Sequence, residues 1–76
     1  AMSRGHVFKT IGKRIAQFRK DAPLTQKACA ERAGISYRYY QSIESGQANI
    51  TIATLLRLAR LFKVHPCDLL PTKSEI

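Results

Sequence analysis

The chain lacks the features on which several classes of protein depend. It has only 76 residues, five acidic side chains, two cysteines and no tryptophan. One domain fits this length, because domains usually hold about 100–150 residues, and a large enzyme with its own cofactor domain does not fit. The longest stretch without a charge, residues 45–56, mixes Gly, Gln, Asn and Thr with apolar residues. No stretch therefore approaches the roughly 20 apolar residues of a membrane span.

Cysteine and histidine form no pattern that predicts a disulfide, a metal site or catalysis. Cys29 and Cys67 stand far apart without a C-x-x-C pair, and no signal-peptide core precedes them, which favours reduced thiols in the cytoplasm. His65 lies near Cys67, but it fits better as the cap of a short helix, so we expect no metal and no cofactor. His6 and His65 are isolated and the carboxylates are dispersed, so we expect that the chain is not an enzyme.

Positive charge, in contrast, is abundant and unevenly placed. Thirteen Lys and Arg residues against five acids give a formal charge of +8. Residues 1–38 hold nine basic and two acidic side chains, whereas residues 39–76 hold four and three. Such a one-sided field attracts polyanions, either nucleic acid or an anionic membrane surface. The alternative is that the charge only keeps a small protein soluble. Hydrophobic residues make up 45% of the chain, which excludes a disordered basic tail.

Apolar residues recur with a helical period and predict a compact, all-α bundle of five helices without strands. The first helix ends near Asp21, because Pro23 disfavours helix at the residue before it. The next two are expected at 26–33 and 37–45, a fourth after the cap Thr51, and a short fifth at 66–70. Thr25 and Ser36 fit as N-caps, and Gly34 and Gly46 as left-handed helix ends. The core stripe of the fourth helix is Ile52, Leu55, Leu58, Ala59 and Phe62.

These helices predict one domain over residues 7–71. Residues 1–6 are expected to form a flexible arm, and residues 72–76 a C-terminal tail. Ala1 before Met2 is typical of an expression scar.

Residues 25–46 have the pattern of a helix-turn-helix, two short helices joined by a turn that contains glycine. Ala30 and Ala33 are small enough to let the two helices approach closely. Gly34 supplies the positive φ of the bend. The third helix of the chain, expected at 37–45, is anchored by an apolar inner face formed by Ile35, Tyr40 and Ile43.

In order and spacing, these pieces resemble the phage-repressor/Cro family of helix-turn-helix domains, also called the xenobiotic-response-element type. The resemblance spans about residues 11–70. It is carried by Phe18-Arg19-Lys20, Leu24-Thr25-Gln26, Ala30, Ala33-Gly34-Ile35-Ser36, Ile43-Glu44-Ser45-Gly46, Leu55, Leu58-Ala59 and Asp68-Leu69-Leu70. Pro23 and Lys63 stand where the family usually has Gly, and Tyr40 replaces a smaller aliphatic residue. The resemblance implies a lambda-repressor-like fold and a sequence-specific, double-stranded-DNA-binding transcriptional regulator whose recognition helix, about 36–45, lies in the major groove.

The outward stripe of this helix carries the candidate base readers. Every position has a hydrogen-bond donor or acceptor, whereas a merely solvated face would more usually carry Glu and Lys. Arg38 is the best reader, because its guanidinium can bind guanine O6 and N7 with two hydrogen bonds. Ser42 and Gln41 rank second. Tyr37 either touches a thymine methyl or a phosphate, or packs on the preceding helix.

Contacts to the DNA backbone are expected around the recognition helix. Gln26 opens a helix whose N–H groups and dipole face an anion, and the resemblance implies that it contacts phosphate and buttresses the third helix. Thr25 is a further candidate for a backbone contact, although it fits better as a cap alone. Ser45, Gln47 and Asn49 resemble the family's backbone-contacting loop, although Asn49 is equally suited to forming the turn.

The resemblance also pairs Arg19 with Glu44, an ion pair that would fix the recognition helix and leave part of Arg19 facing phosphate. Arg14, like Arg4, Lys9 and Lys13, is expected to act on phosphate through its charge.

One short recognition helix reads few base pairs, so we expect a two-fold homodimer on a pseudo-palindromic operator. Its recognition helices would stand roughly 34–36 Å apart, or a multiple of that distance. The candidate interface is the apolar surface of Leu56, Leu61, Val64 and Pro66. The rival hypothesis is a protein-interaction module or antitoxin-like partner that uses the same bundle, and both roles can coexist. A membrane-surface peptide is excluded, because the apolar stripes belong to several short capped helices.

Overall fold

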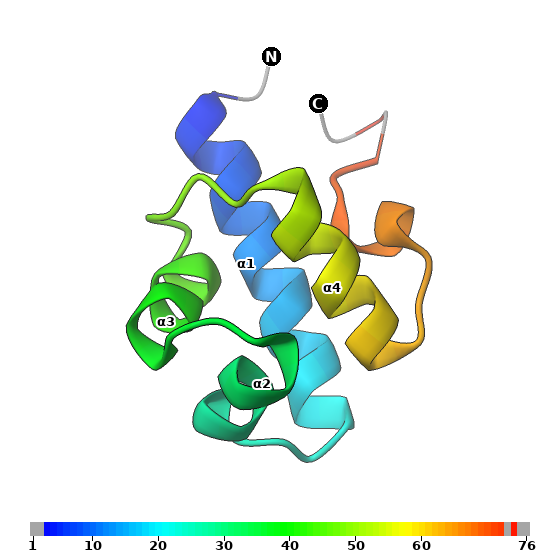
Figure 1. The fold of residues 1–76 in the computed structure, drawn as a ribbon. Helices are drawn as coiled ribbons and strands as arrows, with labels where there is room; N and C mark the ends of the chain where they lie inside the picture. The colour runs from blue at the N-terminus through cyan, green and yellow to red at the C-terminus, as the bar shows by residue number, and fades with distance from the viewer. Residues whose placement is uncertain (1–2, 73, 75–76) are drawn as a thin grey trace.

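Four α-helices and one short 3-10 helix make up the regular structure of the computed structural model, which describes residues 3–72 and 74 (Figure 1). The elements are α1 (Arg4–Asp21), α2 (Gln26–Ala33), α3 (Tyr37–Ser45), α4 (Ile52–Phe62) and η1 (Pro66–Leu69). The described residues contain no strand, as expected. The predicted fifth helix is only a 3-10 turn, because Pro66 begins it and Pro71 follows closely, leaving too few residues for an i→i+4 ladder.

Helices α2, α3 and α4 begin at the caps that the local sequence predicts, and α2 and α3 end at the predicted glycines. The hydroxyls of Thr25, Ser36 and Thr51 accept the backbone N–H three residues further on, which satisfies groups that a helix start leaves unpaired. Gly34 and Gly46 end α2 and α3 with φ of 71° and 80°. The His65 side chain caps η1 in the expected way, and the Asp68 carboxylate accepts the His65 N–H.

Pro23 and Lys63, which stand where the family usually has Gly, differ in backbone conformation. Lys63 ends α4 in the left-handed conformation, with φ of 58°, and its N–H reaches back to the last turn of the helix. It is the only non-glycine residue of the described chain with a positive φ. Around Pro23 no positive φ is needed, because the Leu24 N–H closes the turn on the Arg19 carbonyl.

The first helix begins earlier than the apolar period predicts. Ser3 accepts a hydrogen bond from the His6 N–H, so residues 4–6, which were expected in an arm, form the first turn of α1. Residues 1–2 of the expected arm, and residues 73, 75 and 76 of the expected tail, lie outside the described residues.

The core lies where α1, α3 and α4 meet the short elements between and after them. Ile15, Tyr40, Leu58 and Leu69 have no exposed surface. One core prediction was wrong, because Ile52 is 71% exposed. The period placed it in the core stripe three residues before Leu55, but a period carries no information on whether a neighbouring element covers the first turn of a helix.

A glycine allows α1 to cross α3 closely. A Cβ atom at Gly12 would lie 2.5 Å from the Ile43 carbonyl oxygen and 2.6 Å from that of Glu44. Neither atom belongs to a flexible side chain, so only glycine fits this crossing. The close approach presses the C-terminal half of α3 onto α1, and Figure 1 shows α3 and α4 on opposite sides of α1.

Candidate nucleic-acid interface

Helix α3 has one buried and one exposed face. Tyr40 and Ile43 point into the core and are 0% and 2% exposed. On the other face, Arg38 and Gln41 are exposed, and no group among the described residues binds either side chain. Tyr37 is 45% exposed at the start of the helix. Three of the four base readers expected from the sequence are therefore exposed, and the fourth, Ser42, is half-buried.

The two serines of this surface use their hydroxyl hydrogens within the helix. Ser42 Oγ donates to the Tyr39 carbonyl at 2.6 Å, and Ser45 Oγ donates to the Ser42 carbonyl at 3.0 Å. A hydroxyl whose hydrogen is used in this way still offers lone pairs. Toward a ligand, Ser42 and Ser45 are thus placed to accept hydrogen bonds.

The carboxylate of Glu44 joins three helices beneath this surface. Its Oε2 accepts Arg19 Nε from α1 at 2.6 Å and the Tyr40 hydroxyl from α3. Its Oε1 accepts Gln26 Nε2 from α2 at 3.0 Å and Arg19 Nη2 at 3.2 Å. The ion pair implied by the resemblance is therefore present, and the two side chains are only 15% and 8% exposed.

Proton affinities in this cluster favour the ionised pair. Burial alone would raise the pKa of Glu44, but hydrogen bonds from Arg19, Tyr40 and Gln26 outweigh it and lower the pKa below its ordinary value. The hydrogen bond to Glu44 in turn raises the pKa of Arg19. Burial, together with hydrogen bonds to Cys29 and Glu44, raises the pKa of Tyr40 well above that of a free phenol. A neutral phenol is what allows Tyr40 to donate to the carboxylate.

Tyr40 explains how the bundle accepts an aromatic residue at a position usually occupied by a smaller aliphatic one. Its ring is completely buried, and its hydroxyl has a strong acceptor in Glu44. A buried hydroxyl without a partner would cost about 1–3 kcal/mol. The sequence indicated a rearranged core at Tyr40, but it did not connect this residue with Glu44.

Three residues expected at the phosphates have structural partners. All three nitrogens of the Arg19 guanidinium donate within the protein, to Glu44 and to the Leu24 carbonyl, so its role is mainly to hold the helices. Gln26 was expected to contact phosphate and to buttress the third helix, and the structure shows the second of these, because its Nε2 donates to Glu44 of α3. Arg14 is turned elsewhere, because its Nη1 donates to the Leu70 carbonyl and ties the segment after η1 to α1.

The remaining candidate backbone contacts lie at the surface. Gln47 and Asn49 are exposed in the loop between α3 and α4, and no protein hydrogen bond of the described chain involves either side chain. Ser45 is exposed at the end of α3. Thr25 is exposed as well, and its hydroxyl oxygen caps α2 through the Ala28 N–H.

Of the four apolar residues expected at a dimer interface, Leu56 and Leu61 point to different faces of α4. Leu56 is 47% exposed, whereas Leu61, Val64 and Pro66 are only partly exposed. Leu56 and Leu61 are five residues apart in α4, and at about 100° per residue they point roughly 140° away from each other. Exposed Ile52 lies one helical turn before Leu56, so these two residues form an apolar edge of α4 that the sequence did not predict.

The described residues lack two further kinds of feature. No helix among them is long and apolar enough to cross a membrane. They also contain no group of three or more His, Cys, Asp or Glu side chains that could hold a metal ion.

Known proteins share both the sequence pattern and the fold. The family model for the helix-turn-helix matches residues 15–69. An uncharacterized HTH-type transcriptional regulator of Sinorhizobium fredii is 34% identical over 67 residues, 88% of this chain and 87% of that protein. The N-terminal DNA-binding domain of SinR from Bacillus subtilis is 34% identical with a TM-score of 0.79, over 88% of this chain and 99% of that one.

A crystal structure of SinR, a master regulator for biofilm formation, in complex with DNA is 35% identical. Its TM-score is 0.73, and the match covers 78% of this chain and 95% of that one. The family model spans well over half of the chain and includes both helices of the motif. The chain therefore belongs to the phage-repressor/Cro type of the helix-turn-helix family of DNA-binding transcriptional regulators.

Proposed function

We propose that this chain regulates transcription by inserting α3 into the major groove of a specific DNA site, as a two-fold dimer on a pseudo-palindromic operator. The observation that carries the proposal is the open stripe of α3, whose Arg38 and Gln41 side chains have no protein partner in the described residues. The Glu44 network fixes α3 against α1 and α2. A reading surface must be held rigidly in this way, because its hydrogen bonds to bases tolerate little displacement.

The roles of the stripe follow from its hydrogen-bonding capacity. Arg38 would donate two hydrogen bonds to a guanine. Ser42 would accept from an exocyclic amine, of cytosine or adenine, because its own hydrogen is bound to the Tyr39 carbonyl. Gln41 would bind an adenine edge, and Tyr37 a thymine methyl or a phosphate.

Contacts to phosphate would flank this stripe. The N–H groups at the start of α2, with Thr25 and Gln26, would lie on one side, and Ser45, Gln47 and Asn49 on the other. In this placement the side-chain amide of Gln26 remains bound to Glu44, so the backbone contact at α2 comes from the helix N-terminus. Each phosphate neutralised by a basic side chain would steepen the fall of affinity with salt by a slope of about 0.9.

The proposal is tested by selecting bound sites from a random duplex library, which reports sequence, symmetry and half-site spacing together. We then expect Arg38→Ala to cost roughly 1–3 kcal/mol on the selected site and to relax the preference at one base pair. Competition titrations of wild type and variant against single-base variants of the site measure both effects. Equal losses on the selected site and on random DNA would reduce Arg38 to a phosphate contact, and a library without enrichment would contradict the function.

The dimer is proposed to form along the edge of Ile52 and Leu56, which are 71% and 47% exposed. Burying such side chains contributes about 1.5–3 kcal/mol each when burial is complete. Leu61 points to another side of α4, so it would lie outside this contact.

A further inference from the structure

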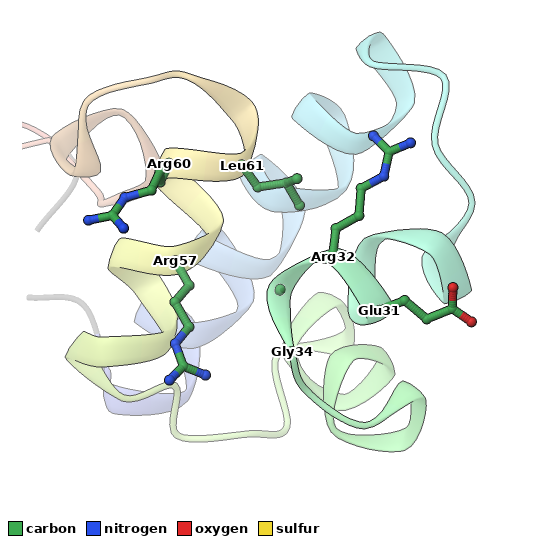
Figure 2. A pocket seen from close by; sticks show the side chains of 7 residues that line it. Glu31, Arg32, Gly34, Arg57, Arg60 and Leu61 are labelled. Carbon is green, nitrogen blue, oxygen red and sulfur yellow. The ribbon is translucent and has the colours of Figure 1, made fainter.

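A hollow of about 400 Å³ lies between α2 and α4, away from the stripe of α3 (Figure 2). It is lined by Glu31, Arg32, Ala33, Gly34, Arg57, Arg60 and Leu61. None of these residues belongs to the base-reading surface, so DNA reading does not account for the hollow. Only Arg60, one helical turn after Leu56 on α4, borders the Ile52–Leu56 edge.

The charge of this hollow is unbalanced. It has three guanidinium groups and one carboxylate. In the described chain none of the three arginines has an ion pair or a hydrogen bond to a side chain, and Glu31 points away from α4 in Figure 2. Positive charge in excess and without partners favours a ligand that carries negative charge.

The lining also has an apolar part. Ala33 is buried, and half-buried Leu61 points from α4 toward α2 (Figure 2). A small apolar floor surrounded by arginines has the composition of protein–protein interfaces, in which arginine is enriched and the rim is polar. A simple inorganic anion would leave that floor unused.

The directions of the three arginines argue for an extended ligand. Arg57 and Arg60 leave α4 in different directions, and Arg32 projects from α2 (Figure 2). The Arg57 guanidinium reaches the turn between α2 and α3, where its Nη1 lies 3.9 Å from the position of a Cβ on Gly34. One small anion cannot touch groups so spread out, whereas several carboxylates along a peptide can each meet one arginine.

A second copy of this chain does not supply such a ligand. Its acids stand singly along the sequence, at Asp21, Glu31, Glu44, Asp68 and Glu75, and Glu44 is bound in its own network. A two-fold contact through the hollow would set the same positive patches against each other, and like charges facing across an interface are unfavourable.

We propose that the hollow between α2 and α4 docks an acidic segment of a different protein, whose carboxylates pair with Arg32, Arg57 and Arg60 and whose apolar side chain packs on Leu61. The segment would bind while α3 is on DNA, because it uses residues of α2 and α4 that the DNA-reading stripe does not contain. The chain would in this way connect its DNA site to a second protein.

The test uses the whole chain and a labelled peptide, Glu-Asp-Leu-Glu-Asp, at low ionic strength. Two further peptides share its length, one with Gly for Leu and one with amides for the carboxylates. We expect NMR shift changes centred on residues 31–34 and 57–61, weaker binding of the Gly peptide, and no binding of the amide peptide. Arg57→Gln/Arg60→Gln should weaken binding about tenfold, the worth of two exposed charge pairs, and should keep the base preference of the selected DNA site.

The matched control is Lys13→Gln/Lys20→Gln, which removes the same charge from exposed positions of α1. An equal loss of peptide binding in that variant would overturn the proposal, because net charge alone would then explain the binding. Shift changes spread over the basic surface or centred on α3 would overturn it as well. Tripolyphosphate that binds the hollow as tightly as the peptide would show a small-anion site, and a DNA duplex that shifts residues 57–61 would show a DNA contact. Either result excludes peptide docking as the specific use of this surface.

Discussion

At the scale of single residues, Glu44 is the side chain of α3 whose replacement we expect to affect stability most. It accepts from Arg19, Gln26 and Tyr40, so one carboxylate holds three helices together. Replacing it strands the Arg19 guanidinium in a site where only 15% of that side chain is exposed. The loss of one partner of a buried pair is strongly destabilising, because the remaining charge keeps its desolvation cost.

We therefore expect Glu44→Ala to lower the free energy of unfolding by about 3 kcal/mol and to weaken DNA binding as α3 loses its anchor. Because folding lowers the pKa of Glu44, its contribution to stability is complete above the unfolded pKa of about 4.3 and is lost as pH falls through the lower folded pKa. The difference in melting temperature between wild type and variant should thus shrink below about pH 4.

Thermal denaturation followed by circular dichroism over a series of pH values measures this dependence. Asp21→Asn is the control, since it removes an exposed carboxylate whose one hydrogen bond within the described residues comes from Gln17. A pH-independent gap between wild type and Glu44→Ala would contradict an ionised, paired Glu44.

Lys63 allows a second prediction at this scale. Its φ of 58° costs an L-residue other than Gly roughly 1–2 kcal/mol, so Lys63→Gly should raise the free energy of unfolding by up to about 1 kcal/mol once the backbone entropy of Gly is counted. Chemical denaturation provides the measurement. Lys63→Gln removes the same charge and keeps the strained backbone, so an equal gain in that variant would assign the effect to charge.

At the scale of the elements, the helix caps could be predicted and the helix crossings could not. Thr25, Ser36 and Thr51 act on N–H groups three residues away, so a local sequence pattern contains all that is needed. Gly12 acts on the carbonyls of Ile43 and Glu44, which are remote along the chain. In the sequence, Gly12 lies within a helical pattern, and no neighbouring residue indicates that α3 will pack against it.

Gly12→Ala should accordingly destabilise the fold by about 1–3 kcal/mol, the usual effect of overpacking, despite the higher helix propensity of Ala. The displaced α3 should also bind the selected DNA site more weakly. Gly5→Ala is the matched control, because a Cβ there meets nothing within 4 Å and Ala should add up to about 1 kcal/mol in a helix. Denaturation and DNA titration of both variants measure the effects, and equal stability in the two would mean that α1 and α3 can separate without cost.

At the scale of the whole molecule, the division of the surface decides which partners can bind together. The stripe of α3 and the arginine-lined hollow belong to different parts of the bundle, whereas the Ile52–Leu56 edge borders the hollow at Arg60. The distribution of positive charge along the sequence did not predict which surface binds a polyanion. Arg14 and Arg19, for example, bind groups within the protein. The overall excess of +8 predicts attraction to polyanions but not the surface that they meet.

The dimer is tested at this scale with Ile52→Gln/Leu56→Gln, which removes apolar surface without changing charge. We expect binding to a palindromic site to weaken at least about tenfold, while binding to a single half-site is unchanged. Sedimentation and titrations on the two duplexes measure this. Leu61→Gln provides the comparison, and a larger effect of that variant would move the interface to the face of the hollow.

The sequence by itself determined the helices, their caps, the helix-turn-helix and the polar stripe of α3, because these depend on residues within one or two turns of each other. Only the tertiary structure decided that Tyr40 and Gln26 join the Arg19–Glu44 pair, that Arg14 binds the Leu70 carbonyl, and that Ile52 is exposed. The physical reason is the same in each case. Burial and pairing depend on which remote element covers a side chain, and a helical period specifies the direction of that side chain but not its neighbour.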